Sequence, residues 1–192
     1  MKICFTTNNA HKLGEVKKII GDSIHLLSLS DIGFQGEIPE THETLEENSL
    51  EKAQYVFNQF KIPVFSEDSG LEVEALDGKP GVHTAHYSGT RDALSNMNKV
   101  LSELNSNDSR MAQFRAVMTY INAQGNVQQF EGIVKGSIAQ SISGSEGFGY
   151  DPIFIPEGYD KTFAELSSDV KNSISHRKRA LEKLVHFLKS NS

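Results

Sequence analysis

The stretch Phe114–Val134, FRAVMTYINAQGNVQQFEGIV, carries the main signal for the fold of this chain. Two runs rich in apolar, β-branched and aromatic residues, 114–121 and 127–134, flank the polar segment Asn122–Asn126, whose glycine is typical of a turn. This pattern predicts a β-hairpin, whose two strands are antiparallel. The sheet that contains the hairpin must therefore include at least one antiparallel pair.

The rest of the chain alternates between predicted strands and predicted helices. Short apolar runs typical of buried strands occur at 2–6, 64–65, 71–75 and 153–155. Apolar residues recur with helical spacing after residue 11, over 44–60, over 92–104 and in the last segment of the chain. We expect Glu67–Gly70 to be a turn that connects two of the short strands. This order of elements predicts an α/β fold with a sheet of mixed direction.

The last predicted helix contains a conflict between charge and burial. In one continuous helix from Val170 to Leu188, Arg177 would lie on the apolar stripe, where an unpaired guanidinium is costly. We therefore expect the helix to restart near Ser175, with this serine as its N-cap. His176 and Arg177 then stand in the first turn, where a bound anion such as phosphate would offset the unfavourable position of the cations.

Composition and charge narrow the classes of function. The 192 residues are 38% hydrophobic and include a single cysteine, so we expect one globular domain, 1–192, without an intramolecular disulfide. The net charge of −6 argues against a protein that grips a nucleic-acid backbone. No apolar run is long enough for a transmembrane helix and no export signal is recognisable, so no membrane association and a cytoplasmic location are expected.

The distribution of charge suggests a metal–phosphate site. Acidic residues concentrate in 37–51 and basic residues in 171–183, although two solvated helix faces would give the same pattern. Glu40 is a candidate metal ligand because it has no evident local structural role. Asp68, beside Glu67, could bind a hard cation and position a water molecule, or it could belong to an ordinary turn.

Two further segments could bind a nucleotide. Thr7–Lys12 joins a strand to a helix, and its N–H groups, side chains and lysine could hold phosphates; it could equally be a capped helix start. It is not a P-loop, because the sequence contains no Gly-x-x-x-x-Gly-Lys. Phe148–Asp151 has two aromatic rings on either side of a glycine, which could accept a stacked purine or belong to a strand that enters the core.

Together these segments resemble the inosine/xanthosine triphosphate pyrophosphatase family, over nearly the whole chain and in the same order. The matching motifs are Thr7-x-Asn9-x-x-Lys12 with Glu15, Glu40 with Glu47-Asn48 and Lys52-Ala53, Ser66 to Leu71 with Pro80-Gly81, Phe148 to Pro152, and Lys171-Asn172 with Ser175 to Arg177. The resemblance implies a long twisted mixed β-sheet with flanking helices, two lobes around a central cleft, and a homodimer. It also implies Mg²⁺-dependent hydrolysis of ITP, dITP and XTP to the monophosphate and diphosphate.

The same resemblance assigns roles to individual residues. Asp68 would bind Mg²⁺ and activate water, and Glu40 would share the metal. The residues expected at the phosphates and sugar are Thr7, Asn8, Asn9, Ala10, His11, Lys12, Lys52 and Lys171, and Ser69 is also expected to bind the substrate. Those expected around the base are Phe148, Gly149, Tyr150 and Asp151, with His176 and Arg177 at its 6-keto edge. This last role competes with phosphate binding by Arg177. His86 departs from the arginine usual in the family.

Two other functions use the same residues. A regulatory module that binds nucleotides without turnover would keep the base and phosphate segments but would not need Asp68. A metal-dependent nuclease or phosphatase would use the same acidic cluster. The negative net charge argues against the nuclease, and the identity of the product would distinguish a phosphatase from a pyrophosphatase.

Overall fold

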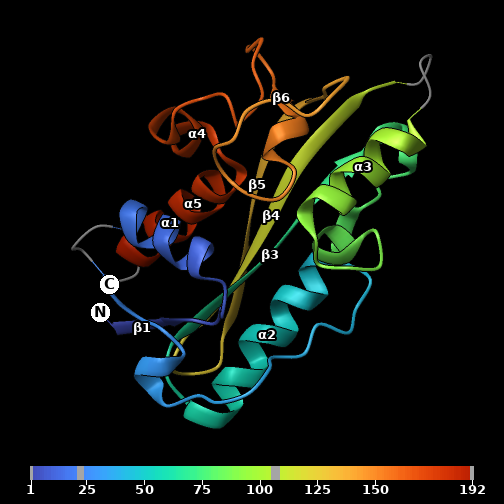
Figure 1. The fold of residues 1–192 in the computed structure, drawn as a ribbon. Coiled ribbons are helices and arrows are strands. Elements are labelled where there is room, and N and C mark those ends of the chain that lie inside the picture. The colour runs from blue at the N-terminus through green and yellow to red at the C-terminus, as the bar shows by residue number, and fades with distance from the viewer. Residues whose placement is uncertain (1, 21–23, 105–108, 191–192) are drawn as a thin grey trace. The chain divides into compact units, whose positions relative to one another are not determined.

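The computed structural model describes residues 2–20, 24–104 and 109–190, which form a sheet with flanking helices (Figure 1). In these residues the sheet has six strands in the order β2-β1-β3-β4-β5-β6. The strands are β1 Lys2–Phe5, β2 His25–Leu27, β3 Val64–Val73, β4 Met111–Ile121, β5 Val127–Ile138 and β6 Phe154–Pro156. The helices are α1 Ala10–Ile20, α2 Leu45–Phe60, α3 Ala93–Glu103, α4 Ser168–Ile174 and α5 His176–Ser190.

The sheet is mixed in direction. β1 pairs in parallel with both β2 and β3, whereas β5 and β6 are antiparallel. The α/β class and the mixed sheet are therefore confirmed. The predicted hairpin is present as well: the Asn122 N–H donates to the Asn126 carbonyl at 3.1 Å between β4 and β5. Both strands of the hairpin are longer than the apolar runs that predicted them.

The chain divides into two compact units. The first comprises 1–68, 116–132 and 177–192, and the second comprises 69–115 and 133–176. β3, β4 and β5 each contribute residues to both units, so the chain passes from one unit to the other along strands. Among the helices that the structure describes, none combines the length and the apolar character needed to cross a membrane.

In the first unit, alternate strand residues pack into two hydrophobic cores. Ile3, Phe5 and Phe65 share a core with α1 and α5, and the Phe5 and Phe65 rings stack with their centroids 4.5 Å apart. Cys4 and Val64 pack instead in a core with α2. Because successive strand residues point to opposite faces, α1 and α5 cover one face of the sheet in this unit and α2 covers the other (Figure 1).

α2 has the bounds and the cap that its sequence predicts. Thr44 is the N-cap, and its Oγ1 accepts a hydrogen bond from the Glu47 N–H at 3.2 Å. Of the predicted apolar stripe, five residues are buried and Phe60 is half-buried; the buried ones are Leu45, Ser49, Ala53, Val56 and Phe57. Lys52, one turn after Ser49, is also buried, at 5% exposure. The helix therefore presents a lysine from its buried side.

The second unit has a core in which α3 packs against residues of β3, β4 and β5. The ring of Phe114 lies at its centre, 4.7 Å from the ring of Phe154 and 6.2 Å from that of Phe163. Gly70 approaches the backbone of Gly81 so closely that an added Cβ would lie 2.3 Å from the Gly81 carbonyl oxygen. A side chain at position 70 would therefore push these two segments apart.

The prediction for Glu67–Gly70 was wrong. This segment is not a turn between two strands, because Val64–Val73 is one continuous strand of 10 residues. Ser66, Glu67 and Asp68 are buried within it, and each side chain has a hydrogen-bond partner on a helix. Buried polar groups are tolerated when they are hydrogen-bonded, so the polarity of these residues does not force the chain to turn.

The predicted interruption of the last helix is confirmed. α4 ends at Ile174, Ser175 has an extended backbone with φ −63° and ψ 151°, and α5 begins at His176. His176 and Arg177 therefore lie in the first turn of α5, as the conflict between charge and burial predicted.

Candidate functional site

The carboxylates at the centre of β3 are the starting point of the candidate site in the first unit. Glu67 and Asp68 are both buried, and their side chains point to opposite faces of the strand. Asp68 faces α2, which supplies Lys52. Glu67 faces the side of α1 and α5, which supply Lys12 and Arg177. The two neighbouring carboxylates therefore have different ion-pair partners.

Asp68 belongs to a charged cluster with one lysine and one further carboxylate. The Nζ atom of Lys52 lies 3.0 Å from Asp68 Oδ1 and also contacts Glu40 Oε1. Burial raises the pKa of Asp68, and the ammonium groups of Lys52 and Lys12 oppose this rise. Burial would lower the pKa of Lys52, but Asp68 and Glu40 outweigh it and the net shift is upward. Lys52 is therefore held as a cation between two carboxylates.

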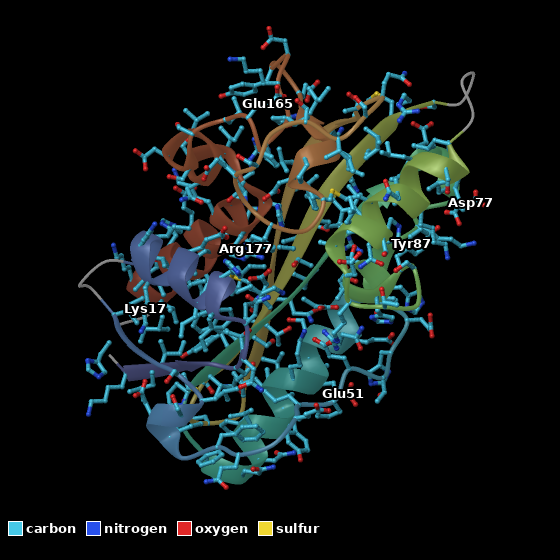
Figure 2. All side chains as sticks on the ribbon, in the orientation of Figure 1. Lys17, Glu51, Asp77, Tyr87, Glu165 and Arg177 are labelled. Carbon is cyan, nitrogen blue, oxygen red and sulfur yellow. The ribbon has the colours of Figure 1, made fainter. Side chains whose placement is uncertain are left out.

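Arg177, which is labelled in Figure 2, is 2% exposed. It binds Glu67 through two parallel hydrogen bonds. Nε donates to Oε2 at 2.7 Å and Nη2 donates to Oε1 at 2.9 Å, while Nη1 donates to Glu15 of α1. Burial would lower the pKa of Arg177, but the two carboxylates reverse this effect. Lys12 Nζ lies 3.5 Å from Glu67 Oε1, and burial lowers the pKa of Lys12. The contact of Arg177 with a base stays a prediction.

The segment Thr7–Lys12 forms a loop and the first turn of α1. The Oδ1 atom of Asn9 accepts hydrogen bonds from the His11 N–H at 3.0 Å and from the Lys12 N–H at 3.1 Å. The Asn9 N–H in turn donates to Thr7 Oγ1 at 3.1 Å. Four residues of the segment are exposed: Asn8, Asn9, Ala10 and His11. The segment is thus a capped helix start whose exposed residues are accessible to a ligand.

Glu40 and Asp68 have the chemistry and the arrangement of ligands for a divalent cation. Their carboxylates converge on one ammonium nitrogen, that of Lys52, so a metal ion near that position would reach both. In the described parts of the chain, no three Asp, Glu, His or Cys side chains gather as a metal site. Mg²⁺ is commonly bound by one or two carboxylates together with water and substrate phosphates, and this pair fits that pattern.

In the second unit, Asp151 joins two other predicted site residues. Asp151 is 4% exposed, and its Oδ2 accepts hydrogen bonds from the Phe148 N–H at 2.8 Å and from Lys171 Nζ at 2.6 Å. Lys171 Nζ also lies 4.7 Å from the centre of the Phe148 ring. A Cβ at Gly147 would lie 2.1 Å from Asp151 Oδ2, so only glycine fits beside this carboxylate. An aromatic ring, a cation and a carboxylate are thereby held together.

Two other predicted residues of the second unit, Tyr150 and His176, contact residues outside the predicted site. The Tyr150 hydroxyl donates to the Thr84 carbonyl at 2.9 Å, and burial raises the pKa of Tyr150. The ring of His176 stacks on Phe114 with a centroid distance of 5.0 Å. The two remaining residues are Gly149, with φ 63°, and Ser69, which is half-buried.

Two carboxylates of the first unit have partners that the sequence did not predict. The sequence suggested a shared cation site for Glu67 and Asp68, but the partner of Glu67 is Arg177, 110 residues away. Glu15 entered only as part of the opening motif, and it also binds Arg177. Lys12 and Glu15 are three residues apart in α1 and so lie on one helix face. This spacing is the signal that could have suggested a common site.

Comparison with known proteins relates the whole chain to one family. The model of the Ham1 family matches residues 3–187. A dITP/XTP pyrophosphatase of Flavobacterium johnsoniae is 46% identical over 189 residues, which are 98% of each chain. A dITP/XTP pyrophosphatase of Bacillus subtilis is 44% identical over 188 residues, which are 96% of this chain and 95% of the relative.

Solved structures give the same relationship. The Ham1 protein of Staphylococcus aureus matches with a TM-score of 0.92 and 36% identity, covering 100% of both chains. A HAM1 protein from Coxiella burnetii matches with a TM-score of 0.90 and 33% identity, covering 99% of both chains. The sequence comparison and the structure comparison therefore relate nearly the whole chain to the same family.

Proposed function

Because the chain belongs to the Ham1 family, we propose that it hydrolyses the deaminated purine nucleoside triphosphates ITP, dITP and XTP to the monophosphate and diphosphate. The reaction removes these nucleotides from the precursors of DNA and RNA. Relatives that match nearly the whole chain are named dITP/XTP pyrophosphatase. In the structure, the observation that carries the proposal is the pair of carboxylates, Glu40 and Asp68, that converges on the Lys52 ammonium group.

Asp68 is the proposed catalytic residue. Its carboxylate is buried beside two lysines, and it would accept a proton from the water that attacks between the α- and β-phosphates. Glu40 and Asp68 would hold Mg²⁺, which when bound would neutralise phosphate charge and orient the reacting phosphate. Lys52 would move from its contact with the carboxylates to a phosphate oxygen.

The exposed start of α1 is the proposed phosphate-binding segment. The N-terminus of a helix and its N–H groups favour an anion, and Thr7–His11 adds hydroxyl, amide and imidazole groups there. Lys12 and Lys52 would stabilise the negative charge that develops on the leaving diphosphate. The cations and the proposed metal would thus act on the part of the substrate that all nucleoside triphosphates share.

The second unit contains the proposed base-binding residues apart from Arg177, which belongs to the first unit. Phe148 would stack on the purine, with Gly149, Tyr150, Asp151, Lys171 and Ser69 also at the nucleotide. His176 and Arg177 would donate to the 6-keto oxygen. A donor that faces the 6-amino group of adenine would be buried without an acceptor, which disfavours ATP.

The proposal extends to the assembly and location of the protein. The family resemblance suggests that the two units act as one pyrophosphatase domain over 1–192. The family resemblance further suggests a homodimer in the cytoplasm, where the nucleotide pool is held.

Product analysis tests this function. The wild type, Asp68→Asn and the exposed control Asp160→Asn would be incubated with Mg²⁺ and ITP, XTP, GTP or ATP, and diphosphate and orthophosphate would be measured separately. We expect diphosphate from ITP and XTP, little product from GTP and ATP, and a loss of at least about 100-fold in kcat for Asp68→Asn only. Orthophosphate as the first product would refute the pyrophosphatase, and tight ITP binding without turnover would support a regulatory module.

A further inference from the structure

The segment that carries Glu40 is held to α2 by contacts to its next two residues. Asn48, on the first turns of α2, forms two hydrogen bonds with the backbone of His42. The His42 N–H donates to Asn48 Oδ1 at 2.9 Å, and Asn48 Nδ2 donates to the His42 carbonyl at 3.0 Å. The asparagine is 4% exposed, so this pair of hydrogen bonds is shielded from water on the side of the helix.

Glu51 forms a second pair of hydrogen bonds with the residue directly after Glu40. The Thr41 N–H donates to Glu51 Oε2 at 2.8 Å, and the Thr41 hydroxyl donates to Glu51 Oε1 at 2.9 Å. The side chain of Glu51 is 21% exposed, and it projects from α2 in Figure 2. The carboxylate thus uses both oxygens to hold Thr41, and its Oε1 also lies 3.9 Å from His42 Nε2.

The contacts follow the geometry of the helix. Asn48, Glu51 and Lys52 are separated by three and four residues, so they lie on one face of α2. They contact His42, Thr41 and Glu40, respectively, which are consecutive in the chain. One helix face therefore binds three successive residues of a segment that has no regular secondary structure of its own at Glu40.

Fixing this segment matters because the Glu40 side chain is 50% exposed. A half-exposed carboxylate on an irregular segment would sample many positions, and binding a metal would require it to give up that freedom. Hydrogen bonds around a ligand residue commonly fix its orientation and strengthen metal binding. Contacts to Thr41 and His42 restrict the backbone directly beside Glu40 before any ion binds.

We propose that Asn48 and Glu51 are positioning residues that hold Glu40 over Lys52 and Asp68 and thereby prepare the metal site. The inference rests on the proposed role of Glu40 as a metal ligand. It gives Glu51 a function that acts through its hydrogen bonds to Thr41. It also explains why a well-buried asparagine stands near the start of an amphipathic helix.

The first test needs no metal or substrate. Amide hydrogen exchange would be measured in the full-length, metal-free protein for the wild type, Asn48→Ala, Glu51→Ala and Asn58→Ala. Asn58 is exposed on the same helix, and its side chain accepts a hydrogen bond from Gln54, so it is a matched control. We expect the exchange of the His42 amide in Asn48→Ala and of the Thr41 amide in Glu51→Ala to rise roughly tenfold, with no change in Asn58→Ala.

The second test measures the metal alone, by titrating the same proteins with Mn²⁺ in the absence of nucleotide. Asn48→Ala and Glu51→Ala should each raise the Mn²⁺ dissociation constant about tenfold. Glu51→Gln removes the same charge but keeps an oxygen that can accept from the Thr41 N–H, so it should recover most of the affinity. In turnover assays, excess Mg²⁺ should restore kcat in both alanine variants and leave KM for ITP unchanged.

The outcomes separate this inference from the function on which it rests. If Glu40→Gln binds Mn²⁺ as the wild type does, the proposed role of Glu40 is refuted. If Glu40→Gln weakens binding while Glu51→Ala and Asn48→Ala do not, the positioning role alone is refuted. Equal loss in Glu51→Gln and Glu51→Ala would also refute it, because charge rather than geometry would then be responsible. Glu51 is partly exposed, so its variants carry the test if Asn48→Ala does not fold.

Discussion

In the first unit, two buried basic residues, Lys52 and Arg177, each bind two carboxylates. Lys52 stands between Asp68 and Glu40, and Arg177 stands between Glu67 and Glu15. An ion taken out of water is costly unless a partner and hydrogen bonds replace its hydration. Each basic residue therefore both neutralises and positions two carboxylates.

The titration of Asp68 should depend on Lys52. Burial raises the pKa of Asp68 above its ordinary value of 3.8, and Lys52 opposes that rise. Lys52→Met removes the opposing cation, so the pKa of Asp68 should rise further. NMR titration of the Asp68 carboxyl group in metal-free protein would measure this change. Lys17→Met, an exposed substitution on α1 (Figure 2), is the control and should leave the pKa of Asp68 unchanged.

The rise in the pKa of Asp68 in Lys52→Met should also change how the free energy of unfolding depends on pH. A carboxyl group whose pKa is higher in the folded than in the unfolded state favours folding below its unfolded pKa, and this contribution is lost as the pH rises through the folded pKa. Lys52→Met should therefore lose more free energy of unfolding, relative to the wild type, at pH 7 than at pH 5. A loss that is the same at both pH values in urea unfolding would show that Lys52 acts by packing alone.

The Arg177–Glu67 pair should behave as a unit. Arg177→Met would leave the Glu67 carboxylate buried without its bidentate partner, a change that costs about 3–5 kcal/mol in comparable buried pairs. Arg177→Lys keeps the charge but not the two parallel hydrogen bonds, so it should fall between the wild type and Arg177→Met. Urea unfolding would give these free energies. In the double variant with Glu67→Gln, the loss should be smaller than the sum of the single losses; additive losses would contradict a direct pair.

At this scale the sequence identified candidate residues more readily than their partners. Lys12, Lys52, Glu40 and Asp68 were predicted from charge and motif, and the structure brings them together in one unit. The partnership of Arg177 with Glu67 joins positions 110 apart. No periodicity spans such a separation, because a contact of this kind depends on how α5 packs against the sheet.

Among the elements, α2 and β3 show where local pattern succeeds and where it fails. α2 was predicted with its cap, since its apolar stripe and Thr44 act within a few residues. β3 was predicted as two strands because four polar residues interrupt its apolar pattern. Ser66, for example, is buried within the strand because its hydroxyl is hydrogen-bonded to the Ser49 hydroxyl at 2.9 Å. The burial of these polar residues depends on hydrogen-bond partners that are distant in sequence, so a local pattern cannot predict it.

The close approach of β3 to the Gly81 backbone depends on a glycine, Gly70, which gives a prediction for this element. In Gly70→Ala the new Cβ would lie 2.3 Å from the Gly81 carbonyl oxygen, and backbone cannot move away as a side chain would. We expect a loss of about 1–3 kcal/mol or more in the free energy of unfolding. Gly14→Ala in α1 meets nothing within 4 Å and should gain about 0.5–1 kcal/mol. A neutral Gly70→Ala would mean that the two segments separate easily.

Across the whole molecule, the two units hold different chemistry. The first unit holds the acidic and basic residues proposed for the metal and phosphates, and the second holds the aromatic, acidic and basic cluster around Asp151. The α/β class and the mixed sheet followed from the order of elements and the hairpin. The resemblance implied two lobes, but the residues of each unit could not be predicted from local pattern, because each unit combines segments from distant parts of the sequence.

This division predicts how two lysine substitutions will affect selectivity. Lys12→Gln removes a cation proposed for the phosphates, which ITP, XTP, GTP and ATP all share, so kcat/KM should fall by a similar factor for each, roughly 10- to 100-fold for a charged hydrogen bond. Lys171→Gln disturbs Asp151 and Phe148, so it should change the ratio of kcat/KM for ITP to that for ATP. Steady-state assays with all four nucleotides would measure both effects. If Lys12→Gln changes that ratio and Lys171→Gln does not, the assignment of base recognition to the second unit is wrong.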